Sequence, residues 1–391
     1  MTRTRPSIAI VGAGMGGLVA AAALDRAGIN VTVYEQAARF ARVGSGIQMG
    51  PNAVKVLRGL GLEQHIRSFA FQPPSWRSRV WDTGEEKFNF LLGKTAEAKY
   101  GAPYLQLHRG DLHEALVSVV PPQAIQLNRR LTGFDPDSDG VTLHFEDGGQ
   151  IRADALIGAD GTHSRVRELL LGPDRPQLSG RVAYRAVYPS ARLNGYRIDD
   201  HTKWWGLDRH IVIYFTNTRQ DEVYLVTSVP EPEWVMESWS AKGDLGELRR
   251  AYEGFHEQVQ RILAACSDVH KWAIVERQPL DRWTHGRVTL LGDACHPMTP
   301  YMAQGAAMAM EDAVVLARCL EGAGPEALSE RLSLYENVRH ERTSSAQLTS
   351  HENKWMGSST DADWVYSYDA WQVPLEPQPP AAKSLVGHHG S

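Results

Sequence analysis

A glycine-rich turn near the start of the chain is the feature that most constrains its fold. Its six residues, Gly12-Ala13-Gly14-Met15-Gly16-Gly17, follow a short apolar strand predicted at residues 7–11. An alanine-rich helix is predicted at residues 16–27 and a second strand at residues 31–35. A strand, a G-x-G-x-x-G turn and a helix in this order begin a βαβ unit, so the pattern predicts a Rossmann-like α/β fold.

The same turn predicts an adenine dinucleotide as ligand. Gly12 permits the tight turn, Gly14 lets the backbone approach a pyrophosphate, and Gly17 allows the helix to pack closely on the strand. Glu35 ends the second strand, where an acid would bind a ribose 2′-hydroxyl and repel a 2′-phosphate. The alternative is a glycine-rich helix start that binds no ligand.

Composition narrows the class of protein. With 391 residues, 42% of them hydrophobic, the chain can bury a large core. The net charge of −5 comes from interspersed charges without a basic run, so we expect no nucleic-acid partner. The three cysteines form neither a disulfide framework nor a CxxC metal pair, and the apolar N-terminal stretch is too short to span a bilayer. We therefore expect a cytoplasmic protein with no metal site and no membrane attachment.

The residue pattern of the chain changes between residues 181 and 227. Four strands rich in Trp, Tyr, Ile and Val predict an antiparallel sheet inserted into the α/β pattern. We also expect a loop at residues 39–51, a strand at 150–158 and a single helix at 245–265. The predicted division is 1–72, 105–178 and 281–350 for the dinucleotide-binding part, 73–104 and 179–280 for the substrate part, and 351–391 for an aromatic and proline-rich C-terminal extension.

A second motif occupies residues 154–167. A buried strand runs into Asp160-Gly161, which places Asp160 beside a pyrophosphate or nicotinamide. Arg165 and Arg167 begin a helix, where their charge opposes the macrodipole, so we expect them to have anionic partners. The alternative is an ordinary strand–turn–helix with surface arginines.

A third motif lies at residues 287–312. It reads as a buried strand, a tight turn at Gly292-Asp293, an irregular loop with His296, and a helix that opens near Met302. Such a segment brings a carboxylate and a helix N-terminus to the mouth of an α/β sheet, where phosphate, ribose or developing negative charge can bind.

Together, the three motifs make the chain resemble the single-component FAD-dependent aromatic hydroxylases, the group A flavoprotein monooxygenases. The resemblance implies the p-hydroxybenzoate hydroxylase type of fold, in which a Rossmann-like FAD-binding domain carries an inserted antiparallel substrate sheet. It implies tightly bound, non-covalent FAD, with NADH or NADPH as a transient co-substrate, since the sequence has no second G-x-G-x-x-G. The residues that we expect to contact FAD are Gly12, Gly14, Gly17, Glu35, Arg42, Gly46, Arg109, Asp160, Asp293, Pro300, Gly305 and Ala306.

The resemblance also implies the chemistry. Enzymes of this family reduce FAD with NAD(P)H, form its C4a-hydroperoxide with O₂ and hydroxylate an electron-rich aromatic ring. We expect the helix near Met302 to direct its free N–H groups at the reduced flavin. His210 and Tyr214 alternate on one predicted strand, so their side chains share a face, although a lone histidine on a strand is often a plain core residue. The predicted catalytic residues are His210, Tyr214, Gln48 and Tyr301, and the predicted substrate contacts are His201, Trp205 and Met302.

Within this family the chain is similar to the 6-hydroxynicotinate 3-monooxygenases, which hydroxylate a pyridine ring at the carbon that bears the carboxylate and release CO₂. The similarity rests on K-W-W-x-x-D-R-H at 203–210, H-R-G-D-L at 108–112 and P-M-x-P-x-M-A-Q-G-A at 297–306. The chain departs from that group at Gln48, His201 and Tyr301, where the group usually carries His, Cys and His. A salicylate or hydroxybenzoate hydroxylase is therefore the alternative.

Two other classes share part of the pattern. A non-hydroxylating FAD oxidoreductase would keep the FAD motifs and use NAD(P)H without an aromatic substrate. A non-enzymatic NAD(P)-binding sensor would carry no flavin. We expect a small aromatic substrate and O₂ as partners, in either a monomer or a homodimer.

Overall fold

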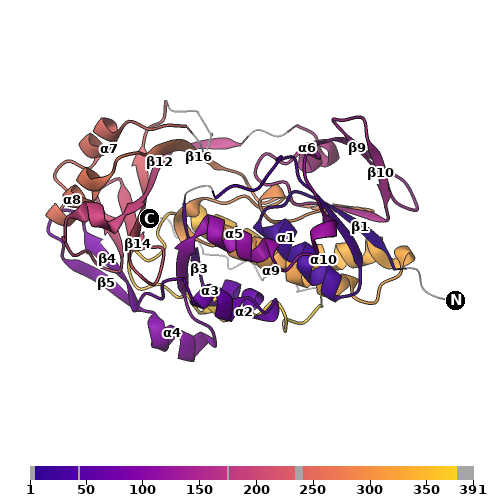
Figure 1. Cartoon of the computed structure of the whole chain (residues 1–391), viewed down its shortest axis with the longest axis horizontal. Coiled ribbons are helices and arrows are strands. Elements are labelled where there is room, and N and C mark those ends of the chain that lie inside the picture. Colours follow the sequence, from indigo (N-terminus) through magenta and orange to yellow (C-terminus); the bar gives the residue numbers. More distant parts are fainter. Residues whose placement is uncertain (1–4, 43–44, 174–175, 234–240, 377–391) are drawn as a thin grey trace, which may run out of the picture.

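A computed structural model describes residues 5–42, 45–173, 176–233 and 241–376 of the chain. Figure 1 shows a helix-rich part around β1, α1, α9 and α10 beside a second part built around β12, β14 and β16. The mixed α/β class with an inserted sheet is confirmed, because the described residues form both a mainly parallel sheet and a large mainly antiparallel one.

The first sheet carries all three sequence motifs. Its described strands follow the order β17-β18-β11-β1-β2-β7. β1 (Ser7–Val11) lies between β2 (Asn30–Tyr34) and β11 (Ala155–Gly158) and is parallel to both. β18 (Val288–Leu290) is parallel to β11 on its other side. The three motifs therefore leave the sheet at the same carboxyl edge, which is where ligands bind in open α/β sheets.

Small residues allow the helices beside this sheet to pack closely. α1 (Met15–Arg26) packs against α9 (Gly305–Leu320), which packs in turn against α10 (Leu328–His351). A Cβ atom added at Gly16 would lie 2.6 Å from Leu291 Cδ2 and 3.2 Å from Ala309 Cβ. Glycine at this crossing lets α1 approach both the third motif and α9.

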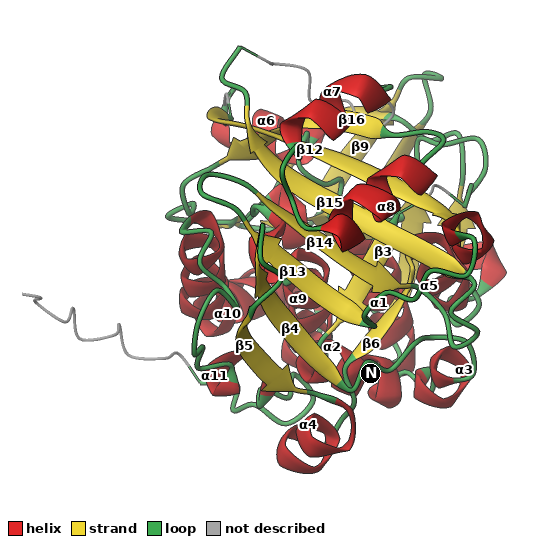
Figure 2. Cartoon of the chain, turned by 90° about the vertical axis from the view of Figure 1, so that its left-hand side faces the viewer, coloured by secondary structure: helices red, strands yellow, loops and turns green. Residues whose placement is uncertain are grey.

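The second sheet has one covered face and one face turned toward the first part. Its described strands follow the order β16-β12-β15-β14-β13-β4-β5. Figure 2 shows α7 (Leu245–Ala251) and α8 (Glu257–Ala265) over the outer face, with α1, α9 and α10 behind the sheet. The strands are β4 (Ser75–Val80), β5 (Glu86–Leu91), β12 (Gln177–Pro189), β13 (His201–Trp205), β14 (His210–Phe215), β15 (Glu222–Pro230) and β16 (His270–Glu276).

Three predictions about these elements are wrong. The predicted helix at 245–265 is two helices, because Gly254 adopts φ +82° and His256 then accepts a hydrogen bond from Gln258 N at the start of α8. The predicted strand at 150–158 breaks at Asp154, whose carboxylate accepts hydrogen bonds from the backbone N and Oγ of Ser7. The predicted loop at 39–51 contains a strand, β3 (Gly46–Met49), which pairs with β6 (Leu105–His108).

The second sheet also departs from a purely antiparallel arrangement. β13 runs parallel to β4, although its other neighbour, β14, is antiparallel. β16 was not predicted as a strand. The other described elements are α2 (Pro51–Gly59), α3 (Glu63–Arg67), α4 (Gly93–Tyr100), α5 (Arg109–Val117), α6 (Arg165–Leu171), α11 (Asp363–Tyr366), β7 (Ile125–Gln126), β8 (Leu131–Pro136), β9 (Val141–Phe145), β10 (Gln150–Ala153) and β17 (Thr284–His285).

Aromatic residues after α10 pack onto the body of the protein. Trp355 and Tyr366 are buried in one cluster with Trp76 and Tyr104, and Trp371 packs against the main core. The proline-rich end predicted for this extension lies largely in residues 377–391, outside the described part of the chain. The extension thus joins the two parts along one edge.

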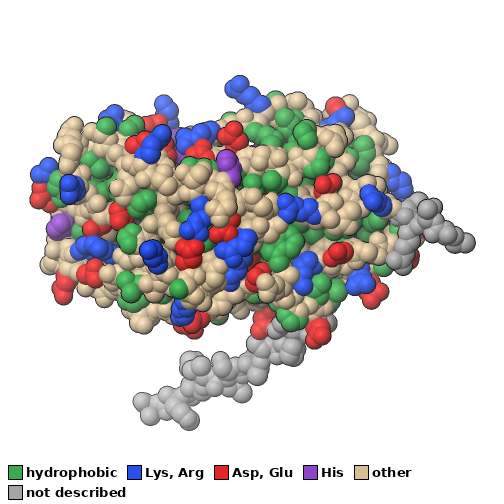
Figure 3. All heavy atoms as spheres, turned by 60° about the horizontal axis from the view of Figure 1, so that its bottom comes forward, with side chains coloured by type: hydrophobic (Ala, Val, Ile, Leu, Met, Phe, Trp, Pro, Cys, Tyr) green, Lys and Arg blue, Asp and Glu red, His purple; other side chains and the backbone are tan. Residues whose placement is uncertain are grey.

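The distribution of surface charge and the state of the cysteines agree with the composition. On the face in Figure 3, acidic and basic side chains are interspersed. Cys266, Cys295 and Cys319 are free and buried. No helix among the described residues is long and apolar enough to cross a membrane.

Candidate active site

The glycine turn of the first motif forms a tight cradle. Gly12 has φ +105°, and a Cβ atom there would lie 2.4 Å from the carbonyl oxygen of Ala159. A Cβ at Gly17 would lie 2.0 Å from the carbonyl oxygen of Gly12, so the helix can begin here only with glycine. A Cβ at Gly14 would meet no atom within 4 Å. The space above Gly14 is therefore open to a ligand.

A cavity of about 560 Å³ opens at this cradle. The cavity is lined by residues at the carboxyl ends of β1, β2 and β11 and in the turn before β8. They include Gly12, Gly14, Glu35, Arg129 and Asp160. Glu35 accepts hydrogen bonds from Ala13 N and Ala37 N, both at 2.8 Å. A carboxylate has further lone pairs, so Glu35 can still accept a ribose hydroxyl. The open cradle and the acid fit the adenosine half of FAD.

Asp160 organises the second motif. Its carboxylate accepts hydrogen bonds from Ser164 Oγ at 2.5 Å, Arg165 N at 2.7 Å and Val166 N at 3.0 Å. Asp160 therefore caps the N-terminus of α6 while it lines the cavity, where it would touch a cofactor through its exposed edge.

The two arginines of this motif have different partners. Arg165 has the predicted anionic partner, Glu168, at 2.8 Å. Arg167 is buried and donates to the carbonyl oxygens of Thr162 and Ala294 at 2.7 and 2.8 Å. Arg167 thus ties the second motif to the third.

The helix of the third motif begins later than predicted. Pro300–Met302 form a 3₁₀ turn, Ala303 adopts the left-handed conformation with φ +54°, and α9 starts only at Gly305. The prediction of a helix opening near Met302 is wrong, because Pro300 and Ala303 make a separate turn. The N-terminus of α9 still faces the sheet edge, since a Cβ at Gly305 would lie 3.7 Å from Asp293 Oδ1.

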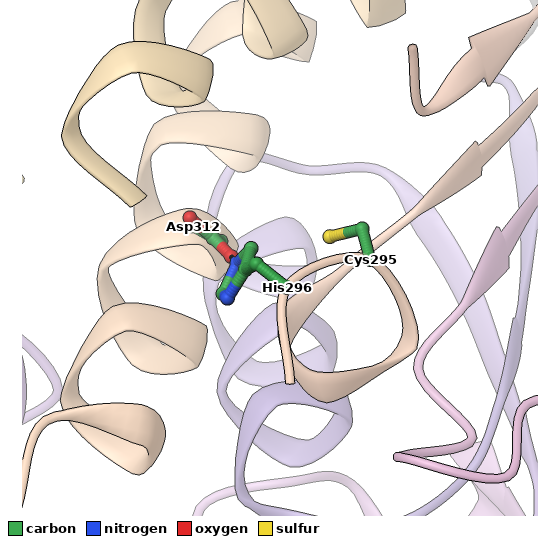
Figure 4. Close-up of side chains that lie close together, drawn as sticks. All are labelled: Cys295, His296 and Asp312. Carbon is green, nitrogen blue, oxygen red and sulfur yellow. Dashed lines mark hydrogen bonds and ion pairs between the residues drawn. The ribbon is translucent and has the colours of Figure 1, made fainter. Parts of the chain in front are cut away.

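A buried ionic network holds this loop against α9 and α10, and Figure 4 shows two of its members, His296 and Asp312, beside Cys295. His296 Nε2 lies 2.5 Å from Asp312 Oδ2, and Arg339 Nε lies 2.7 Å from Asp312 Oδ1. Arg339 also reaches Glu311 at 2.8 Å. Cys295 lies close enough to His296 and Asp312 to suggest a metal site. Arg339 already neutralises Asp312, and burial raises the pKa of the Cys295 thiol, so the cluster is better described as a structural ion-pair network.

The predicted substrate residues meet on the face of the second sheet that is opposite α7 and α8, here called the inner face. Side chains on neighbouring strands form rows, because the register aligns them. His201, Tyr214 and Tyr224 form one row, and Trp205, His210 and Ser228 form another. The prediction that His210 and Tyr214 share a face is confirmed, since Ile211 and Ile213 between them pack with α7 and α8 instead.

Two hydrogen bonds lie where β3 and β6 meet the inner face. Gln106 Nε2 lies 2.7 Å from His201 Nδ1, and the hydroxyl of Tyr104 donates to Gln48 Oε1. Gln48 was predicted on a loop, but it lies on β3 beside Gln106. Burial lowers the pKa of His201 to about 3, so its imidazole is neutral at pH 7. No local pattern points to Tyr104 or Gln106, because each lies more than fifty positions from its partner.

Tyr301 reaches the same face from the 3₁₀ turn. Its hydroxyl lies 3.0 Å from Ser228 Oγ, and its ring centroid is 5.5 Å from that of His210. Arg181 Nε donates to the same Ser228 hydroxyl at 2.7 Å. Burial lowers the pKa of His210 well below its usual value and raises that of Tyr214 well above its usual value. At pH 7 the face thus offers a neutral imidazole and protonated phenols.

The remaining predicted residues lie around these contacts. Gly46 packs against the inner face, because a Cβ there would lie 2.7 Å from the Tyr214 hydroxyl. Met302 is buried in the cluster of Trp76 and Tyr104. Arg42 is exposed and pairs with Asp111 at 2.6 Å. Arg109 and Pro300 are exposed, and Gly305 and Ala306 are half-buried at the start of α9.

Comparison with known proteins decides the family. A family model described as FAD binding domain matches residues 5–349. The chain belongs to this family. It is an FAD-dependent aromatic hydroxylase of the monooxygenase type.

Relatives of this FAD-binding family cover almost the whole chain. The chain is 46% identical over 373 residues to the 6-hydroxynicotinate 3-monooxygenase of Bordetella bronchiseptica, covering 95% of this chain and 97% of that protein. It is 44% identical over 380 residues to the 6-hydroxynicotinate 3-monooxygenase of Pseudomonas fluorescens, covering 96% and 99%. The crystal structure of Klebsiella pneumoniae HpxO complexed with FAD and uric acid matches with a TM-score of 0.81 at 28% identity, covering 92% of this chain and 90% of that one.

Replacing Gly17 tests the cradle. The Cβ of Gly17→Ala would overlap the carbonyl of Gly12, and overpacking of this kind costs about 1–3 kcal/mol of folding stability, so we expect a less stable protein whose displaced turn also binds FAD more weakly. Gly14→Ala is the matched control, since its Cβ meets only open space in the protein. It should fold with unchanged stability and lose affinity for FAD alone. Flavin absorbance after gel filtration and thermal unfolding measure both quantities, and full FAD content in both variants would contradict the assignment.

Proposed function

We propose that the protein converts 6-hydroxynicotinate to 2,5-dihydroxypyridine and CO₂, with NADH or NADPH and O₂ as co-substrates. The observation that carries this proposal is near full-length similarity to two 6-hydroxynicotinate 3-monooxygenases. The inner face supports it, because His210 and Tyr214 lie on one buried surface, in the rows on either side of the Lys203–Val212 pair, and Tyr301 packs against His210.

FAD, when bound at the cradle, would accept a hydride from NAD(P)H and activate O₂ for insertion into the ring. The chain's own residues bind and polarise the aromatic substrate. The neutral imidazole of His210 can accept a hydrogen bond from the ring hydroxyl, which polarises the O–H bond and makes the ring more electron-rich. The protonated Tyr214 can donate a hydrogen bond to a second polar group of the substrate.

Four groups would hold the substrate in register with the cofactor. Gln48 and Tyr301 approach the inner face from opposite sides, one on β3 and the other on the 3₁₀ turn. His201 and Trp205 lie on β13 and border the same space. Since Met302 and Tyr104 are fully buried nearby, water is excluded from this side of the site.

A hydroxybenzoate substrate is the second candidate. The three positions at which this chain departs from the 6-hydroxynicotinate group, Gln48, His201 and Tyr301, all lie at the inner face or against it. Residues at such positions contact the ring directly, so they can change which ring is accepted.

Product analysis separates the two candidates. The purified FAD-bound protein is supplied with NADH or NADPH and one of a panel of acids, which includes 6-hydroxynicotinate, salicylate and 3-hydroxybenzoate. We expect 6-hydroxynicotinate to give one CO₂ and one dihydroxypyridine for each NAD(P)H oxidised. Hydrogen peroxide as the only product from 6-hydroxynicotinate, together with hydroxylation of a benzoate, would favour the second candidate. Because all three described cysteines are free thiols, we propose that the reaction takes place in the cytoplasm.

A further inference from the structure

Lys203 stands at the centre of the inner face. It lies on β13 between His201 and Trp205, and the register places it opposite Val212 on β14 and Ser78 on β4. Its side chain is 1% exposed. A lysine ammonium on this face is therefore removed from bulk water.

The ammonium has no acidic partner among the described residues. Its Nζ lies 3.9 Å from the ring centroid of Trp205 and 3.3 Å from the carbonyl oxygen of Trp355. The other buried lysine of the same sheet, Lys271, reaches Glu231 at 2.6 Å and Glu247 at 3.2 Å. A buried cation is normally paired in this second way. Burial without an acid lowers the pKa of Lys203 to about 7.

Two neighbours of Lys203 present hydrogen-bond donors that have no acceptor among the described residues. Gln106 Nε2 can only donate to His201 Nδ1, so the proton of this neutral imidazole lies on Nε2. His201 Nε2 and Trp205 Nε1 are buried and have no hydrogen-bond partner in the described part of the chain. Three donors thus follow one another along β13, one of them charged. Such a set matches a ligand group that only accepts hydrogen bonds and carries negative charge, which is a carboxylate.

We propose that Lys203 binds the carboxylate of the aromatic substrate and thereby restricts the enzyme to hydroxyaromatic acids. This inference rests on the proposed function. His201 and Trp205 complete the carboxylate site as neutral donors. When the carboxylate leaves as CO₂, the ring product is neutral and Lys203 loses its ion pair, so the product binds more weakly than the substrate.

The test compares an acid with its amide. Binding of 6-hydroxynicotinate and 6-hydroxynicotinamide to the FAD-bound protein is followed through the flavin absorbance change. We expect the acid to bind about 10- to 100-fold more tightly than the amide, because a hydrogen bond to a charged group is worth that much. Lys203→Met and Lys203→Gln should lose this preference while the amide affinity changes little.

Lys55→Met is the matched control. Lys55 is another buried lysine, but it donates to the carbonyl oxygens of Tyr366, Ser367 and Tyr368 away from the inner face. This variant should keep the preference for the acid. An unchanged acid-to-amide ratio in an FAD-bound Lys203 variant would overturn the inference.

The unaltered protein provides a test that does not depend on folding of a variant. Since the free ammonium has a pKa of about 7, about half of it is protonated at pH 7 and about 1% at pH 9, so the acid preference should fall by up to about 50-fold over this range. A preference that is constant over this range would overturn the inference. The surrounding titratable groups do not change charge there, because burial lowers the pKa values of the two histidines and raises those of the four tyrosines: His201, His210, Tyr104, Tyr214, Tyr301 and Tyr366.

Failure of the proposed function would look different. If 6-hydroxynicotinate neither binds nor is hydroxylated, the substrate assignment fails. The same comparison with salicylate and salicylamide then still tests Lys203, because it asks only for the carboxylate.

Discussion

His210→Ala should lower substrate-coupled turnover by about 10- to 100-fold, because it removes the hydrogen-bond acceptor that polarises the ring hydroxyl as charge develops on the ring. His210 is 5% exposed, and its ring lies between those of Trp205 and Tyr301 at centroid distances of 5.2 and 5.5 Å. No other neutral imidazole occupies that row, so a water molecule would have to replace it. FAD should remain bound, because the cradle at Gly12 and Gly14 lies in the other part of the molecule.

Tyr214→Phe should lower the same rate by a comparable factor, because it removes one hydrogen-bond donor to the substrate. Tyr188→Phe is its matched control. The Tyr188 hydroxyl donates to the carbonyl oxygen of Ile262 on the outer face of the same sheet, at 2.9 Å. Product formed for each NAD(P)H oxidised is the measurement. Unchanged coupled kcat/KM in both His210→Ala and Tyr214→Phe would remove these two residues from the mechanism.

Asp312→Ala is expected to reduce the free energy of unfolding by about 3–5 kcal/mol, the cost of leaving a buried partner charge uncompensated. Asp312 is completely buried, and it binds His296, Arg339 and the backbone N of Gly292. Its loss would leave two arginines, Arg339 and Arg342, to share Glu311, and it would release the loop that carries Asp293.

Asp363→Ala serves as the contrasting variant, because Asp363 pairs with Lys99 on the surface at 2.6 Å and half of each side chain is exposed. Its unfolding should be indistinguishable from that of the unaltered protein, since exposed ion pairs contribute little. Denaturant titration with FAD in excess compares the two variants. Equal midpoints would show that the network around Asp312 does not support the fold.

The sequence predicted the first sheet well because its signals are local. Gly12, Gly14 and Gly17 lie within six positions, and the strand before them and the helix after them have their own periodicity. Four strands of the second sheet, β12 to β15, were also predicted from their Trp-, Tyr-, Ile- and Val-rich pattern. Their faces followed from the period of two, which is why His210 and Tyr214 were predicted together.

The substrate site could not be assembled in the same way. The contact between His201 and Gln106 spans 95 positions, and it depends on β13 lying parallel to β4, which no local pattern reports. β3 was read as a loop because glycines interrupt it, although pairing with β6 makes it a strand. In the sequence, Lys203 is only the first residue of the K-W-W-x-x-D-R-H motif. Its importance appears when burial and the lack of an acid are known.

The burial of all three cysteines has a consequence for the lifetime of this catalyst. Reduced flavin that meets O₂ without a ring to hydroxylate releases hydrogen peroxide inside the protein. Peroxide oxidises thiolates rather than thiols. Burial raises the pKa of Cys266 to about 12 and that of Cys319 to about 11, and it raises that of Cys295 as well. The thiols therefore stay protonated when reduced flavin releases hydrogen peroxide, and the cysteines of the enzyme resist oxidation by it.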